Sequence, residues 1–389
     1  MRSRDRKPGG MWLDQPRNPK APLAGLKVLE LARVLAGPWA GQILADLGAD
    51  VIKIESPAGD GTRLWGPPWV EREQGDREAA YYHAANRGKR SVVADFKNAD
   101  DLRRVRELAA GADVVLENFK TGTLARFGLD FASLEALNPR LVYCSITGFG
   151  QTGPRAREAG YDFVIQAMSG FMALTGEPAG QPMKMGISIS DLTCGLYSVI
   201  GIQAALAMRE RTGRGQHVDM ALLDCSVGLL ASQATHYLTT GENPPRMGNE
   251  HAQVSAYGVF PVADGEVVLA PANDGLFRKL LALLGREDLL GEEKFGSNEA
   301  RLANRAELDA MIAAETRKWQ LDELLADCAE DGIPAGRVNA IDAVFEDPQV
   351  RARGMRIDLD GIPGVRSPFT FSEGELALDR PSPRKGEHG

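Results

Sequence analysis

The sequence has few cysteines, and the four present are far apart. Cys144, Cys194, Cys225 and Cys328 form no Cys-x-x-Cys pair. Closely spaced cysteines are typical of disulfide frameworks and of zinc sites. Their absence favours a reduced, cytoplasmic setting, in which isolated thiols act as small buried apolar groups.

Histidines and short catalytic motifs are scarce as well. The five histidines lack the spacing of metal ligands, so we expect no metal site. No P-loop, His-Glu-x-x-His or Gly-x-Ser-x-Gly motif occurs. "GFGQTG" (148–153) matches the dinucleotide fingerprint by letter, but Pro154 follows where the nucleotide-binding helix would begin. We therefore expect no nicotinamide or flavin cofactor.

Long hydrophobic runs and an excess of positive charge are also missing. The longest nearly apolar run (194–208) contains Gln203 and is shorter than the roughly 20 residues that span a bilayer, so we interpret it as a buried helix. The formal net charge is −8, from 45 basic and 53 acidic residues. This balance predicts no nucleic-acid and no membrane partner, and an anionic ligand would need a local basic cluster.

Length and composition predict a globular protein of about two domains. The chain has 389 residues, 43% hydrophobic and 25% charged. Residues 1–20 are charged and broken by Pro and Gly, which predicts a disordered extension. We expect a large domain over 21–225, a linker over 226–240, a small α+β domain over 241–335, and a return segment with a tail over 336–389.

Apolar runs and helical patterns alternate in the first part of the chain. The runs predict strands at 26–32, 49–55, 90–96, 113–119 and 141–147, and the patterns between them predict helices at 37–48, 98–112 and 133–139. This alternation predicts an α/β fold with a parallel sheet covered on both faces. Ligands of such sheets bind beyond the carboxyl ends of the strands.

Three carboxylates are candidates for chemistry. Asp162 and Asp191 each begin a helical run, where an acid more commonly complements the helix N-terminus than it catalyses. Glu177 lies in "TGEPAGQP" (175–182), a loop with two glycines and two prolines. From the residues alone, either a structural or a catalytic role remains open for each.

Several segments carry a resemblance to a known family, among them "LELARVLAGPWAGQILADLGADVIKIESPAGDGTR", "NRGKRSVVADFK", "ENFKTGTLARFGLD", "SITGFGQTGP", "GYDFVIQAMSGFMALTGEP" and "DPQVRARGM". From about residue 22 to 385 the chain resembles the family III CoA-transferases, which include the α-methylacyl-CoA racemases. The resemblance implies a large Rossmann-like domain, a smaller domain and an interlocked homodimer. It also implies acyl-CoA and a carboxylic acid as substrates.

The resemblance places a CoA site on the loops at the strand ends. The matching positions are Leu35, Ala36, Ser56, Ala94, Asp95, Phe96, Lys97, Asn118, Phe119, Lys120, Arg126, Thr147, Gly148, Phe149 and Gly150. Chemistry supports this independently, because CoA carries a 3′-phosphate and a pyrophosphate that Lys97, Lys120 and Arg126 could bind. Ser56 stands where some relatives have an arginine, so phosphate contacts there would be weaker.

The implied activity is CoA transfer from an acyl-CoA thioester to a free carboxylic acid. Similar transferases have an aspartate nucleophile in a T-G-x-x-D-G-x-P loop, and here that position is Ala179. Thr175, Gly176, Gly180 and Pro182 match the loop around it.

Three explanations of Ala179 stay open. Glu177, on the same loop, could be the nucleophile. Alternatively, the chain is a non-nucleophilic CoA-binding subunit of a heteromeric transferase. The third is racemase-like proton exchange, for which Asp162 and Asp191 match the family but Tyr161 replaces a histidine. An ordinary tyrosine pKa of about 10 makes it a poor base near neutrality, so racemisation ranks below transfer.

Overall fold

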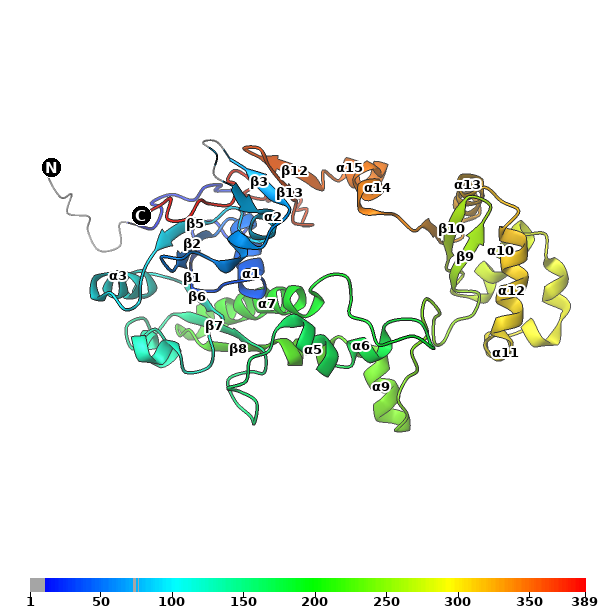
Figure 1. The fold of residues 1–389 in the computed structure, drawn as a ribbon, viewed down its shortest axis with the longest axis horizontal. Helices are drawn as coiled ribbons and strands as arrows, with labels where there is room; N and C mark the ends of the chain where they lie inside the picture. Colours follow the sequence, from blue (N-terminus) through cyan, green and yellow to red (C-terminus); the bar gives the residue numbers. More distant parts are fainter. Residues whose placement is uncertain (1–10, 73–74, 76) are drawn as a thin grey trace. The chain divides into compact units, whose positions relative to one another are not determined.

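The structure, a computed structural model, describes residues 11–72, 75 and 77–389, and these form two compact units (Figure 1). The large unit contains the described residues up to Met172 together with Lys184–Glu242 and Pro348–Gly389. The small unit contains Ala173–Met183 and Asn243–Asp347. It therefore extends past residue 335, and it takes in the loop 175–182 from the middle of the predicted large domain.

A six-stranded parallel sheet forms the centre of the large unit. Its order is β5-β2-β1-β6-β7-β8, and every neighbouring pair is parallel. The strands are β1 (Lys27–Glu30), β2 (Asp50–Glu55), β5 (Arg90–Val93), β6 (Val114–Glu117), β7 (Val142–Thr147) and β8 (His217–Ala221). All five predicted strands belong to it, which confirms the α/β fold class.

Helices cover both faces of this sheet because successive strand residues point to opposite sides. Val28 packs into one core with α1 (Ala36–Asp46), α5 (Asp162–Met168), α7 (Ile189–Thr212) and α8 (Leu222–Gly228). Leu29, the next residue, packs into the other core with α3 (Ala99–Ala110) and α4 (Phe131–Glu135). In Figure 1, α1 and α7 lie side by side.

The prediction of a buried helix over 194–208 is only half correct. Helix α7 buries one side against α1, but Leu196 and Ile200 on its other side are 46% and 61% exposed. Among the described residues it is also the one helix that is long and apolar enough to cross a membrane, although 44% of its most apolar window is buried in the fold.

The segment before the first strand packs onto the large unit from residue 11. Trp12 is 6% exposed within the second core, and the backbone N–H of Leu13 donates to Asp50 at 3.0 Å. The sequence predicted a disordered extension over residues 1–20. Residues 1–10 lie outside the described residues, and residues 11–20 are packed on the large unit and are not disordered.

Short elements complete the large unit. They are η1 (Gly61–Leu64), β3 (Trp69–Glu71), β4 (Arg77–Ala79), α2 (Ala80–His83), η3 (Leu124–Phe127), α6 (Phe171–Leu174, shared with the small unit's first residues), α9 (Ala231–Thr240), α15 (Pro348–Ala352), β12 (Arg356–Leu359) and β13 (Ile362–Val365).

The small unit has an antiparallel sheet and its own core. The sheet order is β11 (Ala335–Arg337), β10 (Gly265–Leu269) and β9 (Gly258–Val262). Phe277, Leu308 and Leu324 contribute helical side chains to the core. The helices are α10 (Asp274–Leu283), η4 (Glu287–Gly291), η5 (Glu293–Phe295), α11 (Asn298–Ala303), α12 (Arg305–Thr316), α13 (Leu321–Asp331) and α14 (Ile341–Glu346). The predicted α+β character is confirmed.

Candidate active site

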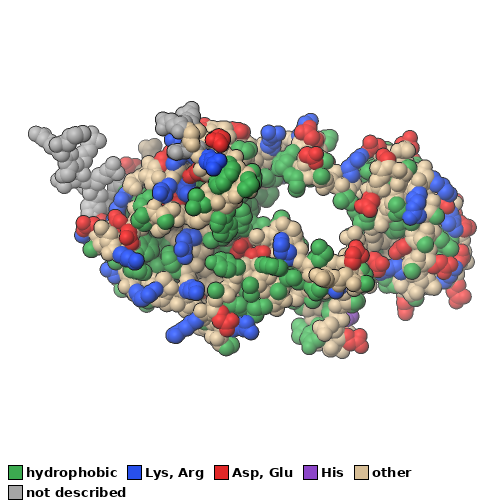
Figure 2. Space-filling model, viewed as in Figure 1, with side chains coloured by type: hydrophobic (Ala, Val, Ile, Leu, Met, Phe, Trp, Pro, Cys, Tyr) green, Lys and Arg blue, Asp and Glu red, His purple; other side chains and the backbone are tan. Residues whose placement is uncertain are grey.

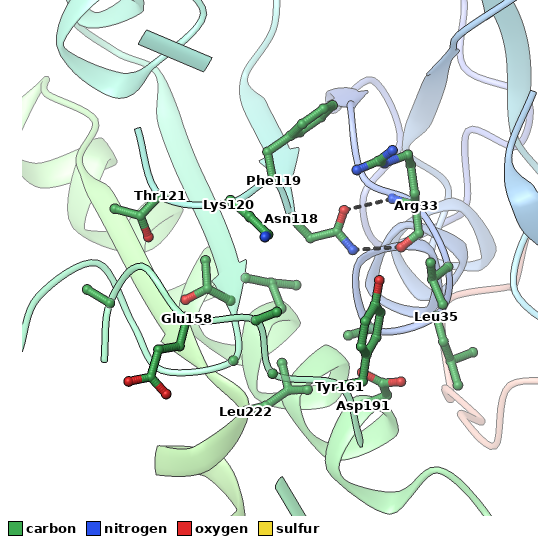
Figure 3. A pocket seen from close by; sticks show the side chains of 18 residues that line it. Arg33, Leu35, Asn118, Phe119, Lys120, Thr121, Glu158, Tyr161, Asp191 and Leu222 are labelled. Carbon is green, nitrogen blue, oxygen red and sulfur yellow. Dashed lines mark hydrogen bonds between the residues drawn. The ribbon is translucent and has the colours of Figure 1, made fainter. Parts of the chain in front are cut away.

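A pocket in the large unit lies at the carboxyl ends of β1, β6 and β7 (Figure 3). Its volume is about 180 Å³, below the roughly 300–1,000 Å³ of sites that enclose a drug-sized ligand, so it could enclose only part of a CoA molecule. The residues that line it are Arg33–Ala36, Asn118–Thr121, Ile146–Gly148, Ala156, Glu158–Tyr161, Asp191 and Leu222.

The turn after β1 is held in an unusual shape by a buried ion pair. Val34 has a φ of +70°, which is costly for a β-branched residue. Its N–H donates to Asp60 at 3.3 Å, and Lys53 donates to the Ala32 carbonyl at 2.7 Å. Lys53 and Asp60 are themselves paired at 3.0 Å, both without solvent exposure. The core of the sheet therefore fixes this wall of the pocket.

The loops after β1 and β6 are joined by two hydrogen bonds. The Asn118 side-chain oxygen accepts from the Arg33 N–H at 2.8 Å, and its amide nitrogen donates to the Arg33 carbonyl at 2.6 Å, the dashed lines of Figure 3. The Arg33 guanidinium lies 4.7 Å from the centre of the Phe119 ring. A cation is thus fixed at the edge of the pocket by backbone and ring contacts.

Three aromatic rings gather beyond the ends of β5 and β6. The Phe96 ring centre lies 6.2 Å from that of Phe119 and 5.6 Å from that of Phe127. Each ring is next in sequence to an exposed basic residue, and these three residues are Lys97, Lys120 and Arg126. Their backbones therefore also come together at the ring cluster.

The predicted CoA contacts divide between this pocket and the surrounding loops. The lining contains Leu35, Ala36, Asn118, Phe119, Lys120, Thr147 and Gly148. The others lie outside the lining, after β2, β5 and β7 and in η3; they are Ser56, Ala94, Asp95, Phe96, Lys97, Arg126, Phe149 and Gly150.

Asp162 and Asp191 meet at the start of α7. The Asp162 carboxylate accepts from the N–H groups of Ser190 at 2.9 Å and Asp191 at 3.4 Å, and from Gln166 at 2.7 Å. Asp162 thus caps α7 from the neighbouring helix α5. Asp191 lines the pocket, where burial, and then the nearby charge of Asp162, raise its pKa to about 7. Such a shift in a cleft is a common mark of functional carboxyls.

The loop that holds Glu177 belongs to the small unit and is tied down through its backbone. Arg246 donates to the carbonyls of Glu177 at 3.0 Å and Gly180 at 2.9 Å, and Gly248 donates to that of Gly176 at 3.1 Å. These bonds leave the side chains of Glu177 and Ala179 exposed. The loop is therefore shaped to present side chains to solvent.

Sequence reasoning missed part of this geometry. Arg33 follows an apolar run directly, and that position could have been recognised as a strand-end residue. No local sequence pattern indicates the hydrogen bond from Val34 to Asp60.

A further titratable group is affected by its surroundings: burial, with Asp191 nearby, also raises the pKa of Tyr81. In the described part of the chain, no cluster of three or more His, Cys, Asp or Glu could hold a metal ion.

Fold and site define an α/β protein with a cation-edged pocket at the carboxyl ends of parallel strands. Comparison with known families then identifies it more narrowly. The chain belongs to CoA-transferase family III, whose family model matches residues 23–389. It moves CoA between an acyl-CoA thioester and a carboxylic acid, as the sequence predicted.

Named relatives and a solved structure are similar over nearly the whole chain. Succinate–glutarate CoA-transferase of Agrobacterium fabrum is 54% identical over 378 residues, 95% of this chain and 94% of that protein. Human succinyl-CoA:glutarate CoA-transferase is 36% identical, over 97% of this chain and 87% of that protein. The crystal structure of a CAIB/BAIF family protein from Brucella suis shares 57% identity with a TM-score of 0.88, over 95% of this chain and 98% of that one.

Proposed function

We propose that the chain exchanges CoA between thioesters of short dicarboxylic acids and free dicarboxylates. The relatives named above act, by their names, on succinate and glutarate, and they match this chain over most of its length. The observation that carries the CoA part of the proposal is the strand-end pocket edged by Arg33 and Lys120.

CoA would lie across the predicted loops, with only part of it inside the pocket. Its phosphates would contact Lys97, Lys120 and Arg126, whose backbones meet at the ring cluster, because guanidinium and ammonium groups are the usual partners of phosphate. On the face shown in Figure 2, basic and acidic side chains are interspersed. A local cluster is therefore a better explanation of CoA binding than a broad basic surface.

Isothermal calorimetry with CoA tests this binding. We expect CoA to bind to the purified protein, and Lys120→Ala to weaken binding by roughly tenfold, as the loss of one charged contact would. Lys279→Ala in the small unit is the matched control. Absence of CoA binding at low-millimolar concentration would remove the proposed site.

We assign Glu177 as the nucleophile in place of the missing aspartate. Its carboxylate oxygen would attack the thioester carbonyl carbon, the C–S bond would break, and CoA would leave as the thiolate. The incoming carboxylate would attack the Glu177 carbonyl carbon of the resulting anhydride, the donor acid would leave as its free carboxylate, and a new anhydride would join Glu177 to the acceptor acid. The thiolate would then attack the new acyl carbon, which releases the product thioester and restores the Glu177 carboxylate.

Glu177→Gln separates this assignment from the two alternatives. We expect the variant to lose transfer from succinyl-CoA to glutarate by at least roughly a thousandfold, because an amide cannot form the anhydride. Glu242→Gln, an exposed acid of the large unit, should leave the rate unchanged. Undiminished transfer in Glu177→Gln would exclude Glu177. An inactive wild-type chain would favour the non-nucleophilic subunit, and α-proton exchange without transfer would favour racemisation.

We further propose that the chain works as a homodimer in a reducing, cytoplasmic compartment. Leu196, Tyr197 and Ile200 form an exposed apolar side of α7, and hydrophobic side chains are also visible on the surface in Figure 2. A second copy is the partner that would cover them, and a heteromer with a related subunit is the alternative. The four buried free thiols fit a reducing compartment.

A further inference from the structure

A buried polar chain crosses the sheet beside the proposed CoA pocket. Glu117 ends β6 and is 4% exposed, and its register partner on β7 is Ser145, 2% exposed. Ser145 hydrogen-bonds to Glu117, and its hydroxyl oxygen lies 2.9 Å from Nε2 of His217 on β8. His217 stacks on the Phe131 ring at 5.4 Å, which fixes its orientation.

This chain is connected to the loop that lines the pocket. The Oε2 atom of Glu117 accepts the Phe119 backbone N–H at 2.7 Å. Phe119 lies between Asn118, which is bonded to Arg33, and Lys120, and all of them line the pocket. The direction of this loop therefore depends on one buried carboxylate.

Glu117 has no salt bridge among the described residues, although burial of an unpaired carboxylate is costly. An amide or an apolar residue would fill the same space without that cost. A second pocket, of about 310 Å³, is lined by Glu117, Lys120, Ser145 and His217, so this polar chain borders a cavity.

We propose that Glu117 is a positioning residue for CoA binding. Through the Phe119 N–H it holds Asn118, Phe119 and Lys120 in the shape that contacts CoA, while Ser145 and His217 orient its carboxylate. This inference rests on the proposed CoA site and adds to it a residue that touches no substrate.

The charge of Glu117 changes near neutrality, which provides a readout that a purely structural role would not give. Burial raises its pKa to about 7, and the hydrogen bonds from Ser145 and Phe119 act in the opposite direction. The titratable groups that face it are Asp219 and His217 on β8, Tyr143 and Cys144 on β7, and Lys120 and Asp130 on the loops. Above its pKa the carboxylate is charged and accepts the Phe119 N–H more strongly.

Calorimetry with free CoA at about pH 8 and about pH 6 tests the inference. We expect Glu117→Gln to raise the Kd for CoA by roughly tenfold at the higher pH and by less at the lower pH, where the wild-type carboxyl is also neutral. At each pH the Kd of the variant is divided by the Kd of the wild type, which cancels the effect of the titration of CoA itself. The control is Glu107→Gln on the exposed side of α3, whose ratio should be one at both pH values.

Every outcome either supports or overturns the role of Glu117. If the ratio of the Kd of Glu117→Gln to that of wild type is the same at the two pH values, or if the Kd is unchanged, the inference is overturned and the proposed function stays intact. A wild-type protein that binds no CoA would overturn both. If Glu117→Gln does not fold, Ser145→Ala decides instead, because it keeps the carboxylate and removes one of its two hydrogen bonds. A Kd raised by roughly threefold supports the inference, and an unchanged Kd overturns it.

Discussion

At the scale of single residues, the proposed activity depends on how carboxyl groups are held. Asp191 is half-buried in the pocket wall with a raised pKa, whereas Glu177 is exposed on a loop whose backbone is tied down. Burial penalises the charged form of a carboxyl. Asp191 is therefore suited to hold or move a proton, while the side chain of Glu177 is accessible from solvent.

The raised pKa of Asp191 predicts a pH dependence of stability. Its pKa is about 7 in the folded protein and 3.8 as the ordinary value. Between these values the folded state keeps a proton that the unfolded state loses, so the free energy of unfolding should fall as pH rises through this window. Asp191→Asn lacks this proton equilibrium and should be stabilised relative to wild type near neutrality, on the order of 1–3 kcal/mol.

Urea unfolding at several pH values measures this difference. Asp224→Asn, an exposed acid in the first turn of α8, is the matched control and should show no such trend. If Asp191→Asn and wild type differ by the same amount at every pH, the pKa of Asp191 is not raised in the folded protein.

Ala179 offers a gain of function at the same scale. The loop bonds from Arg246 and Gly248 are made by backbone carbonyls, so a new side chain at 179 should not break them. We expect Ala179→Asp to raise the rate of transfer by at least roughly tenfold, because it supplies a carboxylate where similar transferases have theirs. The measurement is product thioester by mass spectrometry.

The control for Ala179→Asp is Ala340→Asp, which adds an exposed carboxylate elsewhere in the small unit. A rate no higher than wild type in Ala179→Asp would show that a carboxylate at position 179 does not take part in acyl transfer.

At the scale of elements, the start of α7 illustrates how two helices share one capping group. The N-cap residue Ser188 makes no side-chain capping bond, and Asp162 from α5 accepts the first N–H groups instead. Because Asp191 is in this first turn, the cap also positions the pocket wall. Of the two roles that the sequence left open for Asp162, the structure shows the capping one.

Removal of this cap should destabilise the protein. We expect Asp162→Ala to lower the free energy of unfolding by about 1–2 kcal/mol, the usual cost of a lost N-cap side chain. Urea unfolding at neutral pH measures it, with Asp224→Ala as the control. A loss no greater than in the control would mean that solvent replaces the cap without cost.

At the scale of the whole molecule, α7 has one side in the core and one side exposed. Leu196 and Ile200 are exposed on α7, and this apolar surface is the one on which the homodimer proposal rests. Both faces of the sheet in the large unit are thus covered, but one side of α7 is not.

A charge on this side of α7 tests the proposed dimer. We expect Ile200→Glu to shift the mass in solution from dimer to monomer, because an unpaired carboxylate would be buried in the interface. Light scattering coupled to size exclusion measures the mass. The control is Leu137→Glu, which changes a residue that is 57% exposed outside α7. A wild-type monomer, or a dimeric Ile200→Glu, would exclude this interface.

The sequence by itself determined the parallel sheet, the loops at its strand ends and the absence of the usual aspartate at Ala179, because apolar periodicity and loop motifs are local signals. Only the tertiary structure decided which of those loops share a pocket, that Asp162 caps α7, and that Glu117 supports the Phe119 backbone. These contacts join residues distant along the chain. They form because neighbouring parallel strands bring separate segments to one edge of the sheet, and no local pattern encodes such a meeting.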